Sequence, residues 1–362
     1  MTPDPAFWAG RRVLITGHSG FKGAWLSLWL KHMGASVTGL SAGAPSAGAP
    51  SEPSMHALTR VAEGIEEVDT DVRSFEAVRD AVEGCRPEVV LHLAAQPFVR
   101  RSLRDPRTTY EINVMGTVNV LEAVRGAEGV RAVVAVTSDK AYDNRGTGRA
   151  FVEDDAKGGA DPYSSSKGCA ELVVDAYLRS YFGPGAPAAP RVGAARAGNV
   201  IGGGDRGEDR LVPDLVRAAQ AGEPLRIRNP DAVRPWQHVL EPLSGYLTLA
   251  QALVDDPVAQ GGWNFGPPAG AAPTVGELAA RLAALWPGEV EVVHEREARS
   301  REAASLALDS TKARERLGWA SRWGLDQTLR AIVEWHAAEA RGEDLRAVTL
   351  AQIERYEAAR PR

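Results

Sequence analysis

The stretch RRVLITGHSGFKGAWLSLWL, residues 11–30, decides the fold of this chain. Residues 12–16 form a short apolar run typical of a buried strand, and residues 21–33 follow as a helix. Three glycines lie at the junction of these two elements: Gly17, Gly20 and Gly23. In such a loop the first glycine permits a tight turn, the second lets the backbone approach a pyrophosphate, and the third lets the helix pack closely on the sheet. Because a strand precedes the loop and a helix follows it, the triplet predicts a dinucleotide-binding site rather than a simple turn.

Short β-branched runs and longer helical patterns alternate through the first half of the chain. Further strands are expected at residues 36–40, 65–69, 89–93, 132–137 and 192–197. Further helices are expected at residues 74–85, 108–125 and 163–181. Strands that alternate with helices pair in parallel through crossover connections, and nearly continuous apolar strands suit burial on both faces. We therefore predict an α/β fold with a Rossmann-like, doubly wound parallel sheet.

The second half of the chain has a different pattern. From Gly198 onward, glycine and proline become frequent, and helices mix less regularly with short strands. This favours a dinucleotide-binding domain at residues 1–197 and a smaller, mixed substrate-binding lobe at residues 198–362, with some segments returning to the first domain. Residues 41–54, rich in Ala, Gly, Pro and Ser, cannot bury apolar surface and are expected to form a flexible surface loop.

The composition excludes several classes of protein. The chain has 362 residues and a formal net charge of -5, and its positive residues are spread along it, so no nucleic-acid partner is expected. Two cysteines, Cys85 and Cys169, are too few for a disulfide framework, which fits a reducing cytoplasm. No histidine lies at ligand spacing beside either cysteine, so we expect no metal site. No apolar run reaches the ~18 residues of a membrane span, and residues 1–10 lack the pattern of a signal peptide, so a soluble protein without a membrane partner is expected.

One part of the dinucleotide loop is missing. The acidic residue that follows the second strand in such sites would fall at residues 39–43, where the sequence is GLSAG. Neither a carboxylate for a ribose 2′-hydroxyl nor an arginine for a 2′-phosphate is present, so this position leaves both NAD and NADP open. After the third strand, Asp71 and Val72 are placed to hold the adenine.

Two further segments carry chemistry. Ser138, Asp139 and Lys140 follow the fifth strand, and ligands of open α/β sheets lie beyond the carboxyl ends of strands. Tyr163 and Lys167 are four residues apart, so they project from one face of a helix. A nearby ammonium favours the phenolate form of a tyrosine, which can then take a proton from a carbinol as hydride leaves the same carbon. A surface helix pair and an ordinary strand-end ion pair are the structural alternatives, and the combination with the glycine loop argues against both.

Longer segments of the chain resemble a known family. They are TGHSGFKGAWLSLWL, HLAA, AAQPFVRRS, NVMGTVNVLEAVR, TSDKAYDN, DPYSSSKGCAEL, RAGNVIGGGD, RPWQHVLEPLSGY, WNFGP and RWGLDQTLRAIVEWH. Asn113 lies within the fourth of them. The segments resemble the extended short-chain dehydrogenase/reductase family of nucleotide-sugar enzymes and, within it, the 4,6-dehydratases that act on CDP-glucose. The resemblance runs over nearly the whole chain.

This resemblance implies an NAD-dependent hydro-lyase reaction on a bound nucleotide sugar. The sugar is oxidised at C4, loses water across C5 and C6, and is reduced at C6, so that NAD is regenerated within each turnover. The product is a 4-keto-6-deoxy sugar nucleotide, a precursor of deoxysugars in surface polysaccharides or natural products. The family also implies a homodimer through the helices expected at residues 108–125 and 163–181.

The resemblance further implies a role for each residue of the catalytic group. Tyr163 takes the proton of the C4 hydroxyl, Lys167 lowers the pKa of that tyrosine and holds the nicotinamide ribose, and Ser138 donates a hydrogen bond to the C4 oxygen. Asp139 protonates the departing C6 hydroxyl, and Lys140 takes the C5 proton. To act as a base Lys140 must be neutral, which burial and nearby positive charges favour.

Binding residues follow in the same way. Those expected at the cofactor are Gly17, Ser19, Gly20, Phe21, Lys22, Gly23, Asp71, Val72, Leu93, Ala94, Ala95, Tyr163 and Lys167. Those expected at the substrate are Gln96, Asn199, Arg210, Leu211, Arg234 and His238. Arg234 is a planar, bidentate donor suited to a pyrophosphate, although a single arginine or histidine is commonly solvated or structural.

Two other readings of the sequence stay open. An NAD-dependent 4-epimerase, or a dehydratase of another nucleotide hexose, would also need Tyr163 and Lys167, but an epimerase has no use for Asp139 and Lys140 as an acid–base pair. A non-catalytic NAD(P)-sensing protein on the same fold would be expected to have lost the tyrosine or the lysine. Because both remain, the sequence favours a dehydratase.

Overall fold

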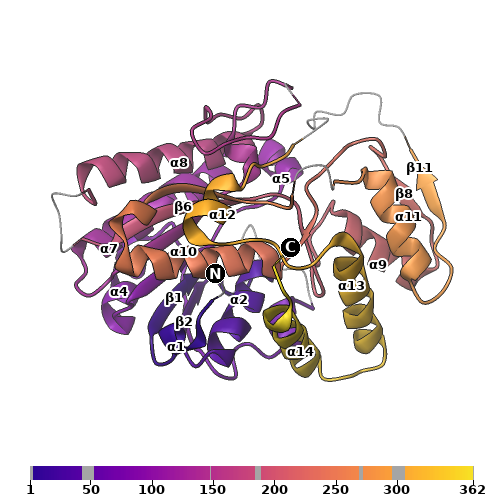
Figure 1. Cartoon of the computed structure of the whole chain (residues 1–362), viewed down its shortest axis with the longest axis horizontal. Coiled ribbons are helices and arrows are strands. Elements are labelled where there is room, and N and C mark those ends of the chain that lie inside the picture. Colours follow the sequence, from indigo (N-terminus) through magenta and orange to yellow (C-terminus); the bar gives the residue numbers. More distant parts are fainter. Residues whose placement is uncertain are drawn as a thin grey trace.

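A parallel sheet forms the centre of the molecule. The computed structural model describes residues 3–42, 53–146, 148–183, 189–268, 272–295 and 306–361. Its seven-stranded sheet has the order β10-β6-β5-β4-β1-β2-β3, with every pairing parallel (Figure 1). The strands are β1 (Arg12–Thr16), β2 (Ser36–Ser41), β3 (Glu66–Asp69), β4 (Val89–His92), β5 (Ala132–Val136), β6 (Arg191–Ala197) and β10 (Gly261–Phe265). The chain runs outward from β1 to β3, returns to the centre of the sheet at β4 on the other side of β1, and then runs outward to β10. The sheet is therefore doubly wound, and the predicted fold is confirmed.

Helices cover both faces of this sheet. One face carries α2 (Phe21–His32) and α10 (Leu240–Asp255), and the other carries α4 (Phe75–Cys85), α7 (Gly116–Gly126) and α8 (Pro162–Ser180). Strand side chains alternate between the two faces, so each face has its own apolar core. The parallel pairing explains why the sequence shows continuous apolar strands rather than an alternation of apolar and polar residues.

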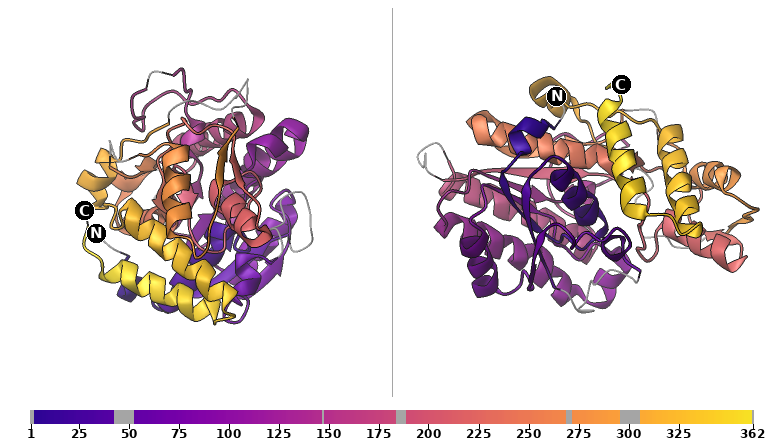
Figure 2. Two further views of the ribbon diagram at one scale, coloured as in Figure 1. Left: turned by 90° about the vertical axis from the view of Figure 1, so that its right-hand side faces the viewer. Right: turned by 90° about the horizontal axis from the view of Figure 1, so that it is seen from below.

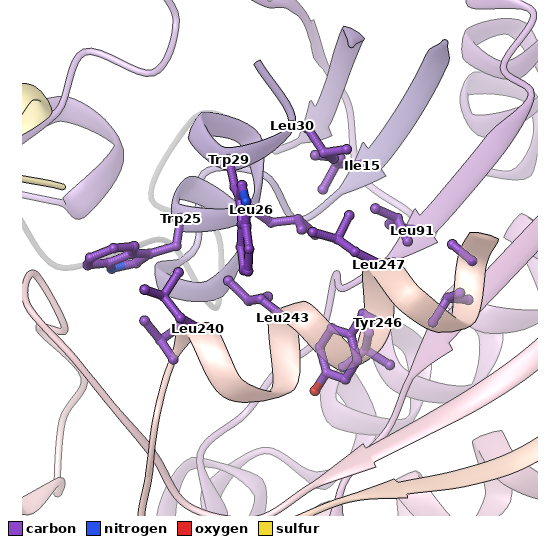
Figure 3. Close-up of a cluster of buried hydrophobic side chains, with 14 of the residues drawn as sticks. Ile15, Trp25, Leu26, Trp29, Leu30, Leu91, Leu240, Leu243, Tyr246 and Leu247 are labelled. Carbon is purple, nitrogen blue, oxygen red and sulfur yellow. The ribbon is translucent and has the colours of Figure 1, made fainter. Parts of the chain in front are cut away.

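The core beneath α2 and α10 is the larger of the two. Its interlocking side chains are shown in Figure 3 and include Ile15, Trp25, Leu26, Trp29, Leu91, Leu240, Leu243 and Leu247. All of them are fully buried. Since burying one large apolar side chain stabilises a fold by about 1.5–3 kcal/mol, this contact fixes α2, and with it the glycine loop, firmly on the sheet.

Segments from the second half of the chain complete the first domain. The strand β10 pairs with β6 at one edge of the sheet. The last helix, α14 (Leu345–Ala358), packs beside α2 (Figure 2). Trp29 Nε1 of α2 donates to Glu357 Oε1 in the last turn of α14 at 2.7 Å. The division of the chain at residues 197 and 198 stays a prediction, with β10, α10 and α14 as segments that return to the sheet.

Five elements from the second half of the chain form a smaller, mixed lobe. They are α9 (Leu211–Ala221), β8 (Leu225–Ile227), α11 (Val275–Leu285), β11 (Val292–His294) and α13 (Leu325–Ala340). They share a separate apolar core that includes Leu215, Leu278 and Leu329. In Figure 1 this lobe lies to the right of the sheet, beyond the carboxyl ends of its strands.

The helix expected at residues 108–125 is interrupted, so this prediction of a single helix is wrong. The structure has α6 (Pro106–Tyr110), a π-helical turn η1 (Glu111–Met115) and then α7. Asn113 in this turn is buried, and its amide bonds to the backbone of Gln96 and to Ser166 Oγ. The wider turn directs this amide inward, which the helical sequence pattern does not reveal.

Two expectations concern the surface of the chain. Residues 43–52, most of the segment expected to form a surface loop, lie outside the described residues. Within the part of the chain that the structure describes, no helix is both long and apolar enough to cross a membrane. Cys85 and Cys169 are free thiols.

Candidate active site

The glycine loop has the geometry that its three glycines predict. Gly17 has a φ of +76°, and a Cβ there would lie 2.7 Å from the backbone nitrogen of Ala94. A Cβ on Gly23 would lie 2.1 Å from the carbonyl oxygen of Gly17, so no other residue fits between α2 and the loop. Gly20 begins α2 without a side-chain cap. The free N–H groups at this helix end suit a pyrophosphate, so the loop fits a dinucleotide.

A large cavity lies over this loop at the carboxyl ends of the strands. Its volume is about 1050 Å³, and it extends from the glycine loop into the smaller lobe. The predicted cofactor residues that line it are Gly17, Ser19, Gly20, Phe21, Lys22, Gly23, Asp71, Val72, Leu93, Ala94 and Ala95. The predicted catalytic and substrate residues that line it are Ser138, Asp139, Lys140, Tyr163, Lys167, Asn199, Arg210, Leu211 and Arg234. Residues far apart in the sequence therefore meet around one space.

Two predicted substrate residues do not line this cavity. The amide of Gln96 is buried in hydrogen bonds to the backbone of Phe98 and to Thr109. His238 lies in β9 (Gln237–His238) and is fully buried, with its ring between Trp25 and Trp323 at centroid distances of 5.7 and 4.8 Å. Burial lowers the pKa of His238 to about 3. The structure thus gives both residues packing roles and does not support the predicted contacts with substrate.

Ser138 and Asp139 form a compact acid site at the end of β5. Ser138 Oγ accepts from the backbone N–H of Lys140 at 3.2 Å and donates to Asp139 Oδ1 at 3.0 Å. The second oxygen, Asp139 Oδ2, is buried and has no hydrogen-bond partner among the described residues. Gly198 keeps room beside it, because a Cβ there would lie 3.2 Å from Oδ2. Burial raises the pKa of Asp139, which favours the protonated carboxyl that an acid catalyst needs.

Tyr163 and Lys167 lie in the first turns of α8, beside this acid. Lys167 Nζ donates to the backbone carbonyl of Val136 at 3.3 Å, and burial lowers the pKa of Lys167 to about 8. Burial raises the pKa of Tyr163 to about 12; a hydrogen bond with Ser138 lowers it, and the charge of Asp139 raises it. The net shift of the Tyr163 pKa is therefore upward, opposite to the lowering by Lys167 that the sequence predicted. The nicotinium charge of a bound cofactor would oppose that burial.

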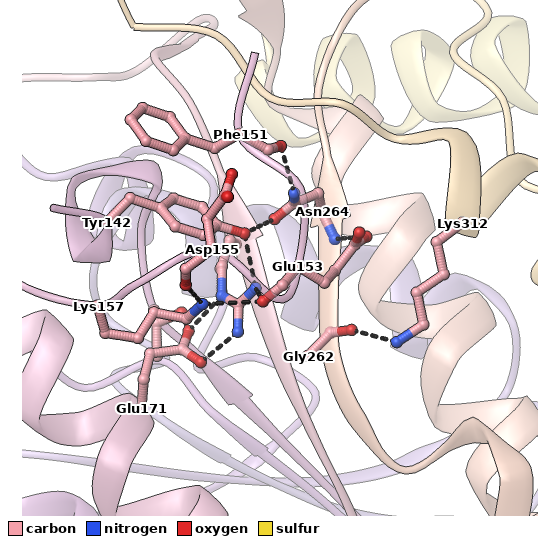
Figure 4. A network of polar contacts seen from close by, with 11 residues as sticks. Tyr142, Phe151, Glu153, Asp155, Lys157, Glu171, Gly262, Asn264 and Lys312 are labelled. Carbon is pink, nitrogen blue, oxygen red and sulfur yellow. Dashed lines mark hydrogen bonds and ion pairs between the residues drawn. The ribbon is translucent and has the colours of Figure 1, made fainter. Parts of the chain in front are cut away.

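A buried polar network supports the catalytic helix (Figure 4). Glu171 of α8 forms an ion pair with Arg196 of β6, with Nη2 and Oε2 2.6 Å apart, and it accepts a hydrogen bond from Thr137 at the end of β5. Arg196 also donates to the hydroxyl of Tyr142 at 2.7 Å, which in turn donates to Asn264 of β10 at 2.7 Å. The network ties α8 to three neighbouring strands and so fixes where Tyr163 and Lys167 point.

The cavity carries more positive charge than the sequence analysis indicated. Arg210 Nη1 is 3.0 Å from both carboxylate oxygens of Asp205, and its guanidinium lies 5.2 Å from the ring centre of Phe98. Arg228 also lines the cavity and pairs with Asp209 at 3.0 Å. Sequence reasoning missed Phe98, Asp205 and Arg228, because only the tertiary fold brings these segments together. The available signals were the segment AAQPFVRRS for Phe98 and the run GGGDRGEDR for Asp205.

Lys22 is a half-buried lysine in the first turn of α2, beside the glycine loop. Its Nζ lies 3.4 Å from the hydroxyl of Tyr246. Burial lowers the pKa of Lys22 to about 7, and the positive charges of Arg210 and Lys167 lower it further. An ammonium in this position suits a phosphate group that enters the cavity, which agrees with its predicted place at the cofactor.

Comparison with protein families gives this geometry a context. A family model described as GDP-mannose 4,6 dehydratase matches residues 14–332. The chain belongs to this family. It is 46% identical over 362 residues to the CDP-glucose 4,6-dehydratase of Salmonella typhimurium, which covers 99% of each chain. The resemblance predicted from the sequence segments is therefore confirmed.

Other relatives have different substrates in their names. The chain is 28% identical over 330 residues to a UDP-glucose 4-epimerase of Mycolicibacterium smegmatis, which covers 90% of this chain and 98% of that one. Among solved structures, the UDP-glucose 4-epimerase of Thermus thermophilus in complex with NAD has a TM-score of 0.74 at 26% identity, covering 89% of this chain and 98% of that chain. MoeE5 in complex with UDP-glucose and NAD has a TM-score of 0.74 at 27% identity, with coverage of 91% and 99%.

Proposed function

We propose that the protein catalyses the NAD-dependent dehydration of CDP-glucose to CDP-4-keto-6-deoxyglucose. The observation that carries this proposal is the pairing of Asp139 and Lys140 beside Tyr163 in the cavity. A dehydratase needs an acid for the leaving hydroxyl and a base for the C5 proton, in addition to the base that starts oxidation. The 46% identity to a CDP-glucose 4,6-dehydratase supports the choice of nucleotide.

Oxidation at C4 uses Tyr163, Ser138 and Lys167. Tyr163 accepts the proton of the C4 hydroxyl, Ser138 donates a hydrogen bond to the same oxygen, and Lys167 contributes positive charge and a donor for the nicotinamide ribose. NAD, when bound, would supply the acceptor for the C4 hydrogen, as hydride, and the donor of that hydride to C6. The glycine loop, Lys22, Asp71 and the segment from Leu93 to Ala95 would hold this cofactor.

Elimination uses the pair at the end of β5. The C4 ketone acidifies the C5 hydrogen, and Lys140 removes that proton. Asp139 gives its proton to the departing C6 hydroxyl, so water leaves and a C5–C6 double bond forms. The buried Oδ2 of Asp139, which has no hydrogen-bond partner among the described residues, supports this role, because burial raises the pKa of this carboxyl and so favours its protonated form.

The nucleotide diphosphate would bind between the two lobes. Arg210 and Arg234 line the cavity on the side of the smaller lobe, and Asn199 and Leu211 lie on the same wall. Arginines of this kind bind phosphate oxygens through two parallel N–H donors.

Incubation with a panel of nucleotide sugars tests this function. CDP-, dTDP-, GDP- and UDP-glucose are each supplied with NAD, and the products are identified by mass spectrometry and by the absorbance of 4-keto-6-deoxy sugars in alkali. The proposal expects a 4-keto-6-deoxy product with the highest kcat/KM for CDP-glucose. An epimerised or unchanged hexose would exclude a dehydratase. A higher kcat/KM for another nucleotide sugar would make the protein a 4,6-dehydratase of that sugar instead.

We also propose a cytoplasmic homodimer that assembles through α8 and the segment from α6 to α7. Its support is a group of exposed apolar side chains on and near these helices: Leu103, Met115, Leu172 and Tyr181. Leu172 is 60% exposed and Met115 is 50% exposed, and α8 packs directly against the turn η1. A second copy of this chain would cover them. The cytoplasmic location is supported by the two free thiols.

A further inference from the structure

Three side chains with metal-ligating atoms converge beside the glycine loop. His18 follows β1, His56 lies in α3 (Met55–Leu58), and Glu67 lies in β3. Their ligand atoms all lie within 4.8 Å of one another. Nε2 of His18 is 2.7 Å and Nε2 of His56 is 2.6 Å from the same oxygen, Glu67 Oε1.

The ring of His18 is held in place for this arrangement. It is buried against Gly39 of β2, where a Cβ would lie 2.3 Å from His18 Cγ. Its other nitrogen, Nδ1, lies 3.0 Å from Ser41 Oγ. A partner on one ring nitrogen fixes the direction of the other, as it does for the histidine ligands of metal sites. His18 Nε2 is thereby directed at Glu67 and His56.

We propose that His18, His56 and Glu67 form a binding site for a divalent transition-metal ion such as Zn²⁺. Two imidazoles and one carboxylate are a ligand set that Zn²⁺ prefers, and a fourth position toward solvent would hold water. This proposal goes beyond the dehydratase function and does not depend on it. The ligands lie at positions 18, 56 and 67, without a sequence motif, which is why the sequence predicted no metal site.

Metal binding requires a small rearrangement that the surroundings permit. Around a tetrahedral Zn²⁺ with bonds of about 2.0–2.1 Å, ligand atoms lie roughly 3.3 Å apart. Glu67 Oε1 must therefore withdraw from both rings by roughly 0.6 Å, and its side chain is 36% exposed, which leaves it room to turn. A histidine can bind the ion through Nε2 only if its ring proton is on Nδ1. In His18 this Nδ1–H can donate a hydrogen bond to Ser41 Oγ.

The protonation states of His18 and Glu67 suit metal binding. Burial lowers the pKa of His18, which keeps its imidazole neutral near pH 7. Although partial burial raises the pKa of Glu67, hydrogen bonds from His18 and His56 outweigh it and lower that pKa, so Glu67 is a carboxylate. A bound ion would join α3 and β3 to the loop after β1.

Calorimetric titration of Zn²⁺ into the full chain, first stripped with a chelator, tests the site. We expect one ion per chain, and His56→Gln and Glu67→Gln each weaken the affinity at least tenfold. The matched control is His32→Gln, because His32 is also a surface histidine beside a glutamate, with Nε2 3.9 Å from Glu357 Oε2. This control keeps the wild-type affinity.

Co²⁺ provides a second readout that depends on the ligand set rather than on affinity. Four-coordinate Co²⁺ gives a visible absorption spectrum, which we expect in the wild type and in His32→Gln and not in Glu67→Gln; circular dichroism confirms that each variant is folded. Equal Zn²⁺ affinity in all four proteins, or no stoichiometric binding by the wild type, would overturn the proposal. No nucleotide sugar is present, so failure here leaves the dehydratase function untouched.

Discussion

Asp139 and Lys140 are neighbours in the chain with different surroundings. Asp139 is buried, and its Oδ2 has no hydrogen-bond partner among the described residues, whereas Lys140 is partly exposed at the cavity wall. Two ionisable groups whose environments differ in this way can divide acid and base duties between them. The first predictions therefore concern single side chains in this cavity.

Lys140→Ala should block elimination more than oxidation. Oxidation at C4 needs Tyr163, which stays in place, so reduced cofactor should accumulate and be visible as NADH absorbance after mixing with CDP-glucose. Turnover should fall about 10²–10⁴-fold, the usual range for loss of an acid–base group. Lys31→Ala, at the far end of α2, is the matched control and should behave as wild type. An unchanged rate in Lys140→Ala would exclude this lysine as the base.

Tyr163→Phe should abolish oxidation itself. The variant keeps the ring and loses the hydroxyl that accepts the C4 proton, so we expect kcat to fall by about 10²–10⁴-fold, with no NADH signal. Binding of NAD, measured by fluorescence quenching or calorimetry, should stay close to that of the wild type. Wild-type turnover in this variant would contradict the assignment of Tyr163.

At the scale of residues, the sequence predicts best where a backbone constraint or a fixed spacing carries the signal. Gly17 and Gly23 lie where no Cβ fits, and Tyr163 and Lys167 share one face of α8. For Gln96 and His238 the sequence could not show that both are buried away from the cavity, because their partners come from distant segments, Thr109 for one and Trp323 for the other.

At the scale of elements, Glu241 shows how α10 and α14 are joined. Its carboxylate accepts from the backbone N–H groups of Arg322 and Trp323 and from the hydroxyl of Tyr356. Burial raises the pKa of Glu241 to about 7, despite these hydrogen bonds. The unfolded chain has the ordinary glutamate pKa of about 4.3.

Glu241 should therefore make stability fall as pH rises. Between pH values of about 4.5 and 7 the folded protein holds a proton that the unfolded chain has lost, so the free energy of unfolding decreases by on the order of 3 kcal/mol and then levels off. Glu241→Gln has no such proton, and its amide can still accept from both N–H groups. Urea unfolding across this pH range should show a flatter profile in the variant. Parallel profiles for both proteins would contradict the raised pKa.

The strands and helices of the first half were predictable because apolar periodicity and caps mark their ends. Ser74 and Asp161, for instance, cap α4 and α8 through their side chains. The π-helical turn at η1 was not predicted, because its distinguishing feature is the tertiary hydrogen bond of Asn113 to Ser166, which a local sequence pattern does not report.

At the scale of the whole molecule, the second lobe was predicted only in outline. Its strands β8 and β11 are short, and β10 returns to the sheet after a long connection through α9 and α10. Such pairing depends on contacts between residues far apart in the sequence, such as Trp263 with Ala195. Periodicity within a local window cannot report them.

The proposed dimer makes a prediction at this scale. Leu172→Glu places a charge at the centre of the exposed apolar group on α8, so it should shift the protein from dimer to monomer in sedimentation or light scattering. Glu171, next to Leu172 in α8, is buried in its ion pair with Arg196, so this substitution should leave the fold intact. A wild-type assembly in Leu172→Glu would show that this surface is not the interface.

The most direct test of the account follows one hydrogen through the reaction. CDP-glucose carrying deuterium at C4 is incubated with the protein and NAD, and the product is examined by mass spectrometry and NMR. The account predicts a 4-keto-6-deoxy product that has lost one water and carries the deuterium at C6. A product that keeps its C6 hydroxyl, or no deuterium at C6, would contradict it.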